Sequence, residues 1–361
     1  MQVGGGRGAA MRRILAVSWL VWPLLAMAIV AVLAASAYRG WELTHPVRQY
    51  GTGTPASRAS LDYRCLPVPQ ASAICSPTML ATPGHHVRIA AWIVPSFADI
   101  YPSTSSNWSQ NTVVLVPDHG QSRTSGTFPV WPLTLALQHA GFNVVLFDPR
   151  GTGQSGGAGI GFGTVEVNDI LAVVNYLPQL GPPQGHVAVW GLGTGADAAI
   201  VAASRSRVIS AVVADSPYVS AAAYLRQAIP AWTGWPAFPF AETILWSMQR
   251  ETGISYGAYS PLRAVRSLGG PNPRPLLLVA GANDRLTPPS NIQTLFAASH
   301  DSLAQALVVP GASHLQAFAQ SPPSLRNPEY TTYMCHALTV LREMSVPRSA
   351  TSTLGACGAQ A

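Results

Sequence analysis

The stretch from residue 186 to residue 195, HVAVWGLGTG, decides the fold. Its first part, His186–Gly191, is a short apolar run that predicts a buried strand. Glycines at 191, 193 and 195 follow, and this spacing is typical of a sharp turn from a strand into a helix. A strand that leads into a helix is the repeating unit of a mostly parallel sheet.

Other short apolar runs on both sides of this stretch predict further strands. Apolar residues at helical spacing in Trp131–Ala140 and Val165–Leu180 separate several of them. This alternation indicates an α/β fold, a mostly parallel sheet with helices on both faces. The predicted strands are His86–Pro95, which we expect to be an antiparallel edge strand, Thr112–Pro117, Phe142–Asp148, His186–Gly191, Val208–Asp215, Pro275–Gly281 and Ala304–Pro310.

One long interval, residues 218–268, breaks this alternation. It is rich in aromatic residues, among them Trp232 and Trp235, and it is punctuated by prolines. We predict a cap insert over the carboxyl ends of the strands, with a small-molecule or lipid ligand bound beneath it. The alternative is a helical layer that only packs on the core.

Polar motifs follow the predicted strands, at the end of the sheet where ligands bind in α/β folds. Asp118-His119-Gly120-Gln121 follows the first parallel strand, and Asp148-Pro149-Arg150-Gly151 opens a glycine-rich loop after the second. The last two strands are followed by Asn283–Pro288, which contains Asp284, and by Gly311-Ala312-Ser313-His314.

In this order and at these places, the motifs resemble those of the α/β-hydrolase superfamily, over roughly residues 85–345. The resemblance is to the bacterial serine-hydrolase type that includes monoglyceride lipase-like and S33 peptidase-like members. It implies that His314 is the catalytic base and that Asp284 orients it. It also implies an oxyanion hole made by the backbone N–H groups of Gln121 and Thr194. With the aromatic insert, it indicates four ligand-binding residues, His119, Gly120, Trp232 and Trp235.

Gly193 stands where that superfamily places its nucleophilic serine. Deleting the nucleophile of a serine protease costs about 10⁶ in turnover, so we predict an impaired enzyme. Glycine also adopts the strained turn at lower cost than serine. The alternative is an active hydrolase of ester, lipid or peptide bonds that uses His314 and Asp284 with water or with an unidentified nucleophile. Among substitute hydroxyls, the turn points the Thr194 side chain elsewhere. Ser122, Ser155 and Ser216 each have a simpler role in a turn or cap.

A different class of protein explains part of the same stretch. Gly191–Ala196 fits the dinucleotide-binding pattern G-x-G-x-x-A, and Asp215 ends the next predicted strand. This pattern occurs in the middle of the domain, and it leaves Asp284 and His314 unexplained. We therefore expect no cofactor. We also expect no metal, because neither the histidines nor the cysteines have ligand spacing.

The N-terminal region contains Ile14–Ala37, 24 residues without a charge, which is long enough to cross a bilayer. The local excess of positive charge is larger on the N-terminal side of this run than on its C-terminal side. By the positive-inside rule, everything after the run is expected outside the cytoplasm. A cleaved signal peptide is the alternative, because Ala35-Ser36-Ala37 has the A-x-A form. The predicted organisation is a cytoplasmic segment at 1–13, a membrane anchor at 14–37, a linker at 38–59, the hydrolase domain at 60–346 and a tail at 347–361.

Composition limits the partners of this chain. Its formal charge of +6 comes from scattered arginines without any lysine, and only 10% of its residues are charged. That scatter argues against nucleic-acid binding, which needs clustered basic residues. A protein partner remains open. Four cysteines lie beyond the anchor and permit three pairings in an oxidising compartment, of which Cys65–Cys75 with Cys335–Cys357 closes the shortest loops; free thiols are the alternative.

Overall fold

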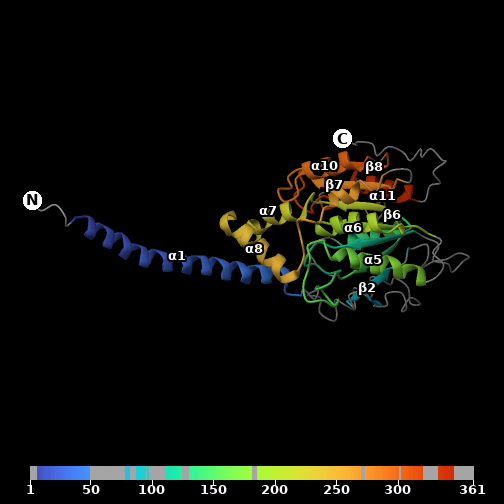
Figure 1. The fold of residues 1–361 in the computed structure, drawn as a ribbon. Coiled ribbons are helices and arrows are strands. Elements are labelled where there is room, and N and C mark those ends of the chain that lie inside the picture. Colours follow the sequence, from blue (N-terminus) through green and yellow to red (C-terminus); the bar gives the residue numbers. More distant parts are fainter. Residues whose placement is uncertain are drawn as a thin grey trace, which may run out of the picture. The chain divides into compact units, whose positions relative to one another are not determined.

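The computed structural model describes residues 6–48, 78–81, 87–94, 96, 111–123, 130–180, 185–269, 273–300, 302–319 and 332–344. The chain forms two compact units. The larger comprises His45–Tyr224 and Ile254–Ala361, and the smaller comprises Met1–Thr44 and Leu225–Gly253. Figure 1 shows the elements of both units in sequence colours.

The larger unit is built on an eight-stranded sheet in the order β1-β2-β4-β3-β5-β6-β7-β8. Strand β2 pairs antiparallel with both β1 and β4, and every pair from β4 to β8 is parallel. The mostly parallel sheet predicted from the sequence is therefore confirmed. The strands are β1 (Thr78–Ala81), β2 (Arg88–Val94), β3 (Thr112–Val116), β4 (Asn143–Phe147), β5 (Val187–Leu192), β6 (Ile209–Asp215), β7 (Leu276–Gly281) and β8 (Ala304–Val309).

Helices cover both faces of this sheet, because its strands are apolar on both sides. In β3, Val114 and Val116 belong to one buried cluster, which includes residues of α5 and α6. Val113 and Leu115 belong to a second cluster, with residues of α4 and α11. The helices of this unit are α4 (Val130–His139), α5 (Glu166–Tyr176), η1 (Leu177–Leu180), α6 (Thr194–Arg205), the start of α7 (Ala221–Thr233), α9 (Pro261–Val265), α10 (Pro289–Ser299) and α11 (Thr332–Glu343).

The seven predicted strands coincide with β2 to β8, each to within two residues at either end. Strand β2 is antiparallel as predicted, but it is not the edge strand, because β1 pairs with its outer side. The four-residue strand β1 was not predicted, because four residues are too few to show a period. Val165–Leu180 divides into α5 and the short helix η1. The predicted start of the last helix at Asn327 lies outside the described residues.

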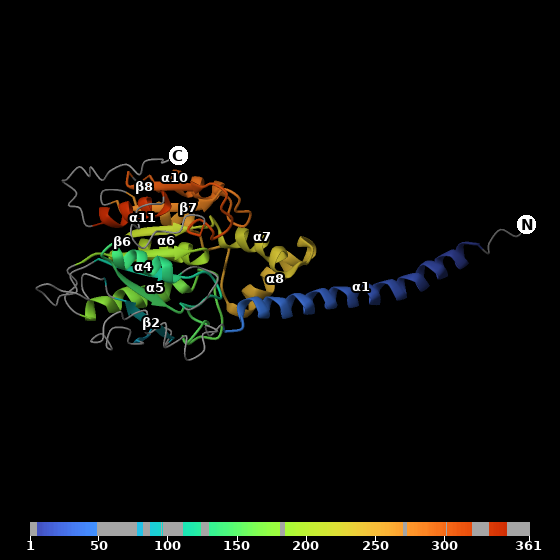
Figure 2. The same ribbon diagram turned by 180° about the vertical axis from the view of Figure 1, so that it is seen from behind.

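The smaller unit combines α1 (Gly6–Thr44) with the part of α7 from Leu225 and with α8 (Ala237–Thr252). Helix α8 lies along the end of α1 nearest Thr44, and the rest of α1 extends beyond it (Figures 1 and 2). Helix α1 continues past Ala37 to Thr44, so the first seven residues of the predicted linker are helical. Only residues 225–253 of the predicted insert belong to this unit, whereas α9 belongs to the larger one.

Candidate active site

The turn between β5 and α6 forces the backbone into a conformation that favours glycine. Gly193 has φ 54° and ψ −123°, and its N–H donates to the carbonyl oxygen of Asp215 at 2.9 Å. A Cβ on Gly191 would lie 2.2 Å from the carbonyl oxygen of Gly195, and one on Gly195 would lie 2.4 Å from that of Pro117. The three glycines therefore allow strand, turn and helix to approach closely.

The predicted acid and base meet at the ends of β7 and β8. Nδ1 of His314 lies 2.8 Å from Oδ2 of Asp284. The Asp284 carboxylate also accepts hydrogen bonds from the backbone N–H groups of Leu286 and Thr287, at 2.9 and 2.8 Å, and from the Thr287 hydroxyl, at 2.7 Å. The other ring nitrogen of His314, Nε2, is buried and has no hydrogen-bond partner among the residues that the structure describes. An oriented imidazole with a free Nε2 is the geometry of a general base.

A carboxylate to which the sequence analysis assigned no role lies at the turn of Gly193. It belongs to Asp118, which follows β3, and its Oδ1 accepts hydrogen bonds from the N–H of Thr194 at 2.8 Å and from the Thr194 hydroxyl at 3.0 Å. Nδ1 of His119 is 3.0 Å from the same oxygen. An ideal Cβ on Gly193 would lie 2.4 Å from Oδ1 and 2.5 Å from Cγ of Asp118. Asp118 thus fills the space where a side chain at position 193 would begin.

This carboxylate is ionised in the folded protein. Burial raises the pKa of Asp118, but the charge of His119, its hydrogen bond, the charge of His314 and the Thr194 N–H outweigh burial and hold the pKa well below its usual value. Burial lowers the pKa of His314, whereas the hydrogen bond to Asp284 and the negative charges of Asp118 and Asp284 raise it, and the net shift is upward. The charge of Asp118 is thus one of the causes that favour the protonated form of His314.

The two amides predicted to form the oxyanion hole both donate to Asp118. The Thr194 N–H donates to the side chain, as described above, and the Gln121 N–H donates to the backbone carbonyl oxygen at 3.2 Å. Their role with a substrate stays a prediction.

A second carboxyl group, that of Asp215, lies at the end of β6, and the sequence analysis considered it only in the dinucleotide-binding alternative. Oδ1 accepts from the Ser216 hydroxyl at 2.9 Å, and Oδ2 accepts from the Tyr333 hydroxyl at 3.0 Å. Burial raises the pKa of Asp215 to about 6, although both hydrogen bonds and the charge of His314 lower it. Ser216 has a φ of 58°, and its Oγ lies 3.4 Å from the N–H of Leu315, which joins this group to the loop of His314. The only sequence signal was an acid at the end of a strand.

The predicted binding residues are distributed over both units. In the larger unit the His119 ring lies 5.3 Å from that of Phe162, and Gly120 has a φ of 69° in the same turn. In the smaller unit Trp235 packs edge-on against Phe240 at 4.8 Å and beneath the Arg39 guanidinium of α1 at 5.1 Å. Trp232 is half-buried in α7. Their contact with a ligand stays a prediction.

The glycine-rich loop after β4 supports the sheet through buried polar contacts. Asp148 pairs with Arg123 at 2.5 Å, and Arg150 pairs with Asp169 at 2.7 Å. Ser155 donates to the carbonyl oxygen of Asp148 at 2.5 Å and accepts from the N–H of Ala90 at 2.9 Å. Ser155 therefore has the turn role that the sequence indicated, and its hydroxyl is fully engaged.

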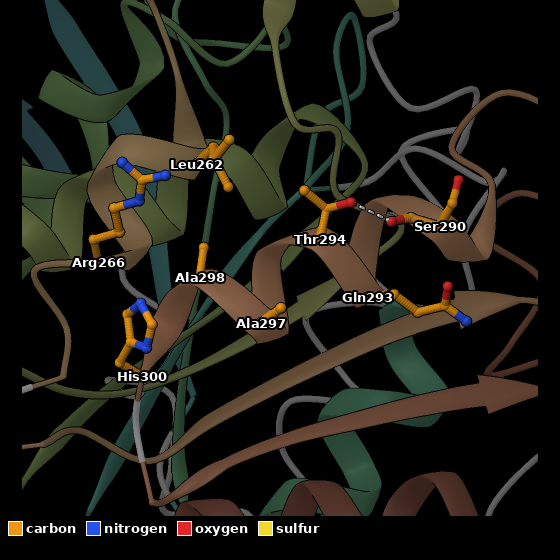
Figure 3. A pocket seen from close by; sticks show the side chains of 8 residues that line it. All are labelled: Leu262, Arg266, Ser290, Gln293, Thr294, Ala297, Ala298 and His300. Atoms are coloured by element: carbon orange, nitrogen blue, oxygen red, sulfur yellow. Dashed lines mark hydrogen bonds between the residues drawn. The ribbon is translucent and has the colours of Figure 1, made fainter.

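A surface hollow of about 620 Å³ lies between α9 and α10 (Figure 3). Its lining contains neither Asp118 nor Gly193, and neither Asp284 nor His314. The Thr294 hydroxyl, which points along α10, donates to the carbonyl oxygen of Ser290 at 2.8 Å. This hollow is separate from the acid and base. It is lined by Leu262, Arg266, Ser290, Gln293, Thr294, Ala297, Ala298 and His300.

The strand order, the tight turn after β5 and the paired acid and histidine after β7 and β8 define an α/β-hydrolase. More closely, residues 131–335 match the model of the prolyl oligopeptidase family, and the chain belongs to that family. The superfamily inferred from the sequence is thus confirmed, and the matching family is neither of the two subgroups to which the sequence was compared.

Known proteins share this fold at low sequence identity. The esterase Pf2001 of Pyrococcus furiosus superimposes with a TM-score of 0.62 and 21% identity, over 83% of this chain and 98% of the esterase. DcsB, in a complex with its substrate analogue, gives a TM-score of 0.54 and 14% identity, over 75% of this chain and 99% of DcsB. YfhR of Escherichia coli O157:H7 is 21% identical over 252 residues, 70% of this chain and 78% of YfhR.

Proposed function

We propose that this chain is a membrane-anchored, extracytoplasmic member of the serine-hydrolase lineage that does not form an acyl-enzyme. In this proposal the site binds a small-molecule or lipid ligand, and Gly193 occupies the position of the nucleophile. The observation that supports it most is the Asp118 carboxylate, because it takes the space in which the side chain of a nucleophile at 193 would lie.

Two physical arguments connect that carboxylate to the loss of acyl transfer. Acyl transfer develops negative charge on an oxygen, which needs free N–H donors. The N–H of Thr194 already donates to Asp118, whose own negative charge would repel the developing oxyanion. In addition, the upward shift of its pKa keeps His314 protonated to higher pH, and a protonated imidazole is no base.

The anchoring part of the proposal is supported by the surface of α1. Within residues 21–44, α1 contains an 18-residue stretch with a mean hydropathy of 2.0, so the helix is long and apolar enough to cross a membrane, by length and composition. From Val21 to Ala31 the side chains are exposed on every side of the helix, which suits lipid and is unfavourable in water. Cys335 is disulfide-bonded, in keeping with an oxidising compartment outside the cytoplasm.

A fluorophosphonate probe tests the catalytic part. It reacts covalently with activated serines, and we expect no labelling of the wild-type chain, while the Pyrococcus furiosus esterase, treated in parallel, serves as the reference for a structural neighbour. Labelling of this chain at any serine, located by peptide mass spectrometry, would contradict the proposal. Membrane fractionation of the full chain tests the anchor.

A second candidate function is hydrolysis through the Asp118 carboxylate. An ionised carboxylate can act as a nucleophile, and here one oxygen is held by Thr194 while a free Nε2 is present on His314. The carboxylate would displace a leaving group from a substrate carbon, and water, losing its proton to His314, would cleave the resulting ester. A His314→Gln variant would then accumulate an ester on the peptide that contains Asp118, and Asp118→Asn would not.

A further inference from the structure

Three small residues one helical turn apart lie on one face of the last turns of α1. Ser36, Gly40 and Thr44 are all buried in a helix whose neighbouring residues are mostly exposed. They face α8, and a Cβ on Gly40 would meet the hydroxyl of Ser247. Small residues at this spacing let two helix backbones approach closely, as in helix pairs within membranes.

Hydrogen bonds fix how the two helices pair. The Ser36 and Thr243 hydroxyls lie 2.7 Å apart, and the Ser247 hydroxyl donates to the carbonyl oxygen of Ser36 at 3.0 Å. Two turns further on, the Thr44 hydroxyl lies 3.5 Å from the Glu251 carboxylate. Since the contacts advance along both helices together, α1 and α8 are parallel.

The parallel register sets the level of α8 along the anchor. Ser36 is level with Thr243. The start of α8 therefore lies beside the part of α1 that precedes Ser36, which is the last part of the apolar run. About 20 residues, or 30 Å of helix, cross the hydrocarbon. If the crossing begins at Ile14, it ends near Leu33, and the turns from Ser36 to Thr44 lie in the headgroup layer.

The exposed side chains at this level suit that layer. Tyr38 and Trp41 of α1 are exposed, as are Phe238 (88%) and Trp246 (54%) of α8. The Arg250 guanidinium lies 5.8 Å from the Trp246 ring. Tryptophan and tyrosine favour the membrane interface, where the ring contacts acyl chains and polar groups reach water.

We propose that the α1–α8 helix pair seats the insert in the headgroup layer of a lipid bilayer, with Phe238 and Trp246 in contact with lipid. This inference rests on the anchoring proposed above. It requires that α1 is retained, because cleavage after Ala37 would remove Ser36, which bonds to both Thr243 and Ser247.

The test uses the full chain in phosphatidylcholine vesicles whose acyl chains carry bromine, a short-range quencher of tryptophan. Trp246→Phe should remove a quenchable part of the emission. Gly40→Leu, which forces α8 away from α1, should lower the quenching of the wild-type tryptophans by a similar amount while the protein stays in the vesicles. Ala34→Leu, the matched control at an exposed position of α1, should leave quenching unchanged.

Because Gly40→Leu can also disturb the fold of the insert, a cross-link gives a second measure. Ser36→Cys combined with Thr243→Cys should form a disulfide in the vesicles, and Ala34→Cys with Thr243→Cys should not. Vesicle-bound protein in which Trp246→Phe changes nothing, or in which the first cysteine pair does not close, would overturn the docking and leave the anchor standing. A chain that begins at Tyr38 or stays in solution would overturn the anchor itself.

Discussion

The carboxylate of Asp118 and the backbone of Gly193 share one small volume, since a Cβ at 193 would lie 2.4 Å from Oδ1. The two residues come from different strands, β3 and β5, that are neighbours in the sheet. A glycine at 193 is therefore favoured twice, by the positive φ of the turn and by the occupied space beside it.

Restoring serine at position 193 alone should not restore activity. Gly193→Ser places a side chain at φ 54° and against Asp118, and we expect a loss of about 2–5 kcal/mol in the free energy of unfolding. When Gly193→Ser is combined with Asp118→Ala, the serine side chain has space, and the Thr194 N–H no longer donates to a carboxylate. This double variant should hydrolyse p-nitrophenyl acetate about 10²-fold or more above buffer.

The matched control for that pair of substitutions is Gly193→Ser with Asp118→Asn, which keeps the volume of the side chain. It should be as inert as the single variant. If the space-conserving and the space-opening variants were equally active, Asp118 would not be the obstacle that the geometry indicates.

The pKa of His314 should fall when its carboxylate partner is removed. Asp284 raises that pKa by accepting the Nδ1–H and by its charge. We expect Asp284→Asn to lower it, since the substitution removes the adjacent negative charge that favours the protonated imidazole. An NMR titration of the imidazole resonances, assigned with His314→Gln, measures the shift, and an unchanged His314 titration would contradict the pairing.

Asp215 should make the protein more stable in mild acid than at neutral pH. Its folded pKa of about 6 is raised above its unfolded value, so its contribution is present below the unfolded pKa and is lost as pH rises through 6. Asp215→Asn removes this dependence. Between pH 4.5 and 7.5 the variant should gain about 2 kcal/mol over the wild type in urea unfolding. Asp284, whose pKa is lowered, serves as the control of opposite sign, because its contribution is lost as pH falls.

The buried ion pair of Arg123 and Asp148 should be essential for stability. Arg123→Met leaves the Asp148 carboxylate buried without its charge partner, which should cost about 3–5 kcal/mol. The exposed pair of Arg226 and Glu242 provides the matched control. Arg226→Met should cost less than about 1 kcal/mol in the same denaturation experiment. Similar losses in the two variants would mean that burial of the pair does not determine its effect.

Sequence was sufficient for seven of the eight strands, because a buried parallel strand is apolar at nearly every position and ends at a polar or glycine residue. The ends of β5 (Val187–Leu192) and of the neighbouring strands could therefore be located from the local sequence alone. The end of α1 could not. Gly40 and Thr44 lie in a stretch that looks like a linker, although together with Ser36 they form one buried face of the helix. They are buried only because α8, some 200 residues later in the chain, packs on them.

The candidate site was predictable only where a residue lies in a recognisable local motif. Asp284 and His314 belong to a spacing that the superfamily shares, so each could be assigned from its own motif. Asp118 has no such motif, and its importance arises from a contact with Gly193 that depends on the pairing of β3 with β5. Its one sequence signal is the joint occurrence of an acid before His119-Gly120 and a glycine at 193.

The volume shared by Asp118 and Gly193 also limits which single mutations could introduce serine chemistry at this site. A mutation that returns serine to position 193 meets the carboxylate, and a mutation that removes the carboxylate leaves no nucleophile. Neither single step gains catalysis, so selection for hydrolysis has no gradual path through these two positions. Under the proposed function, serine chemistry at this site would therefore require both substitutions together.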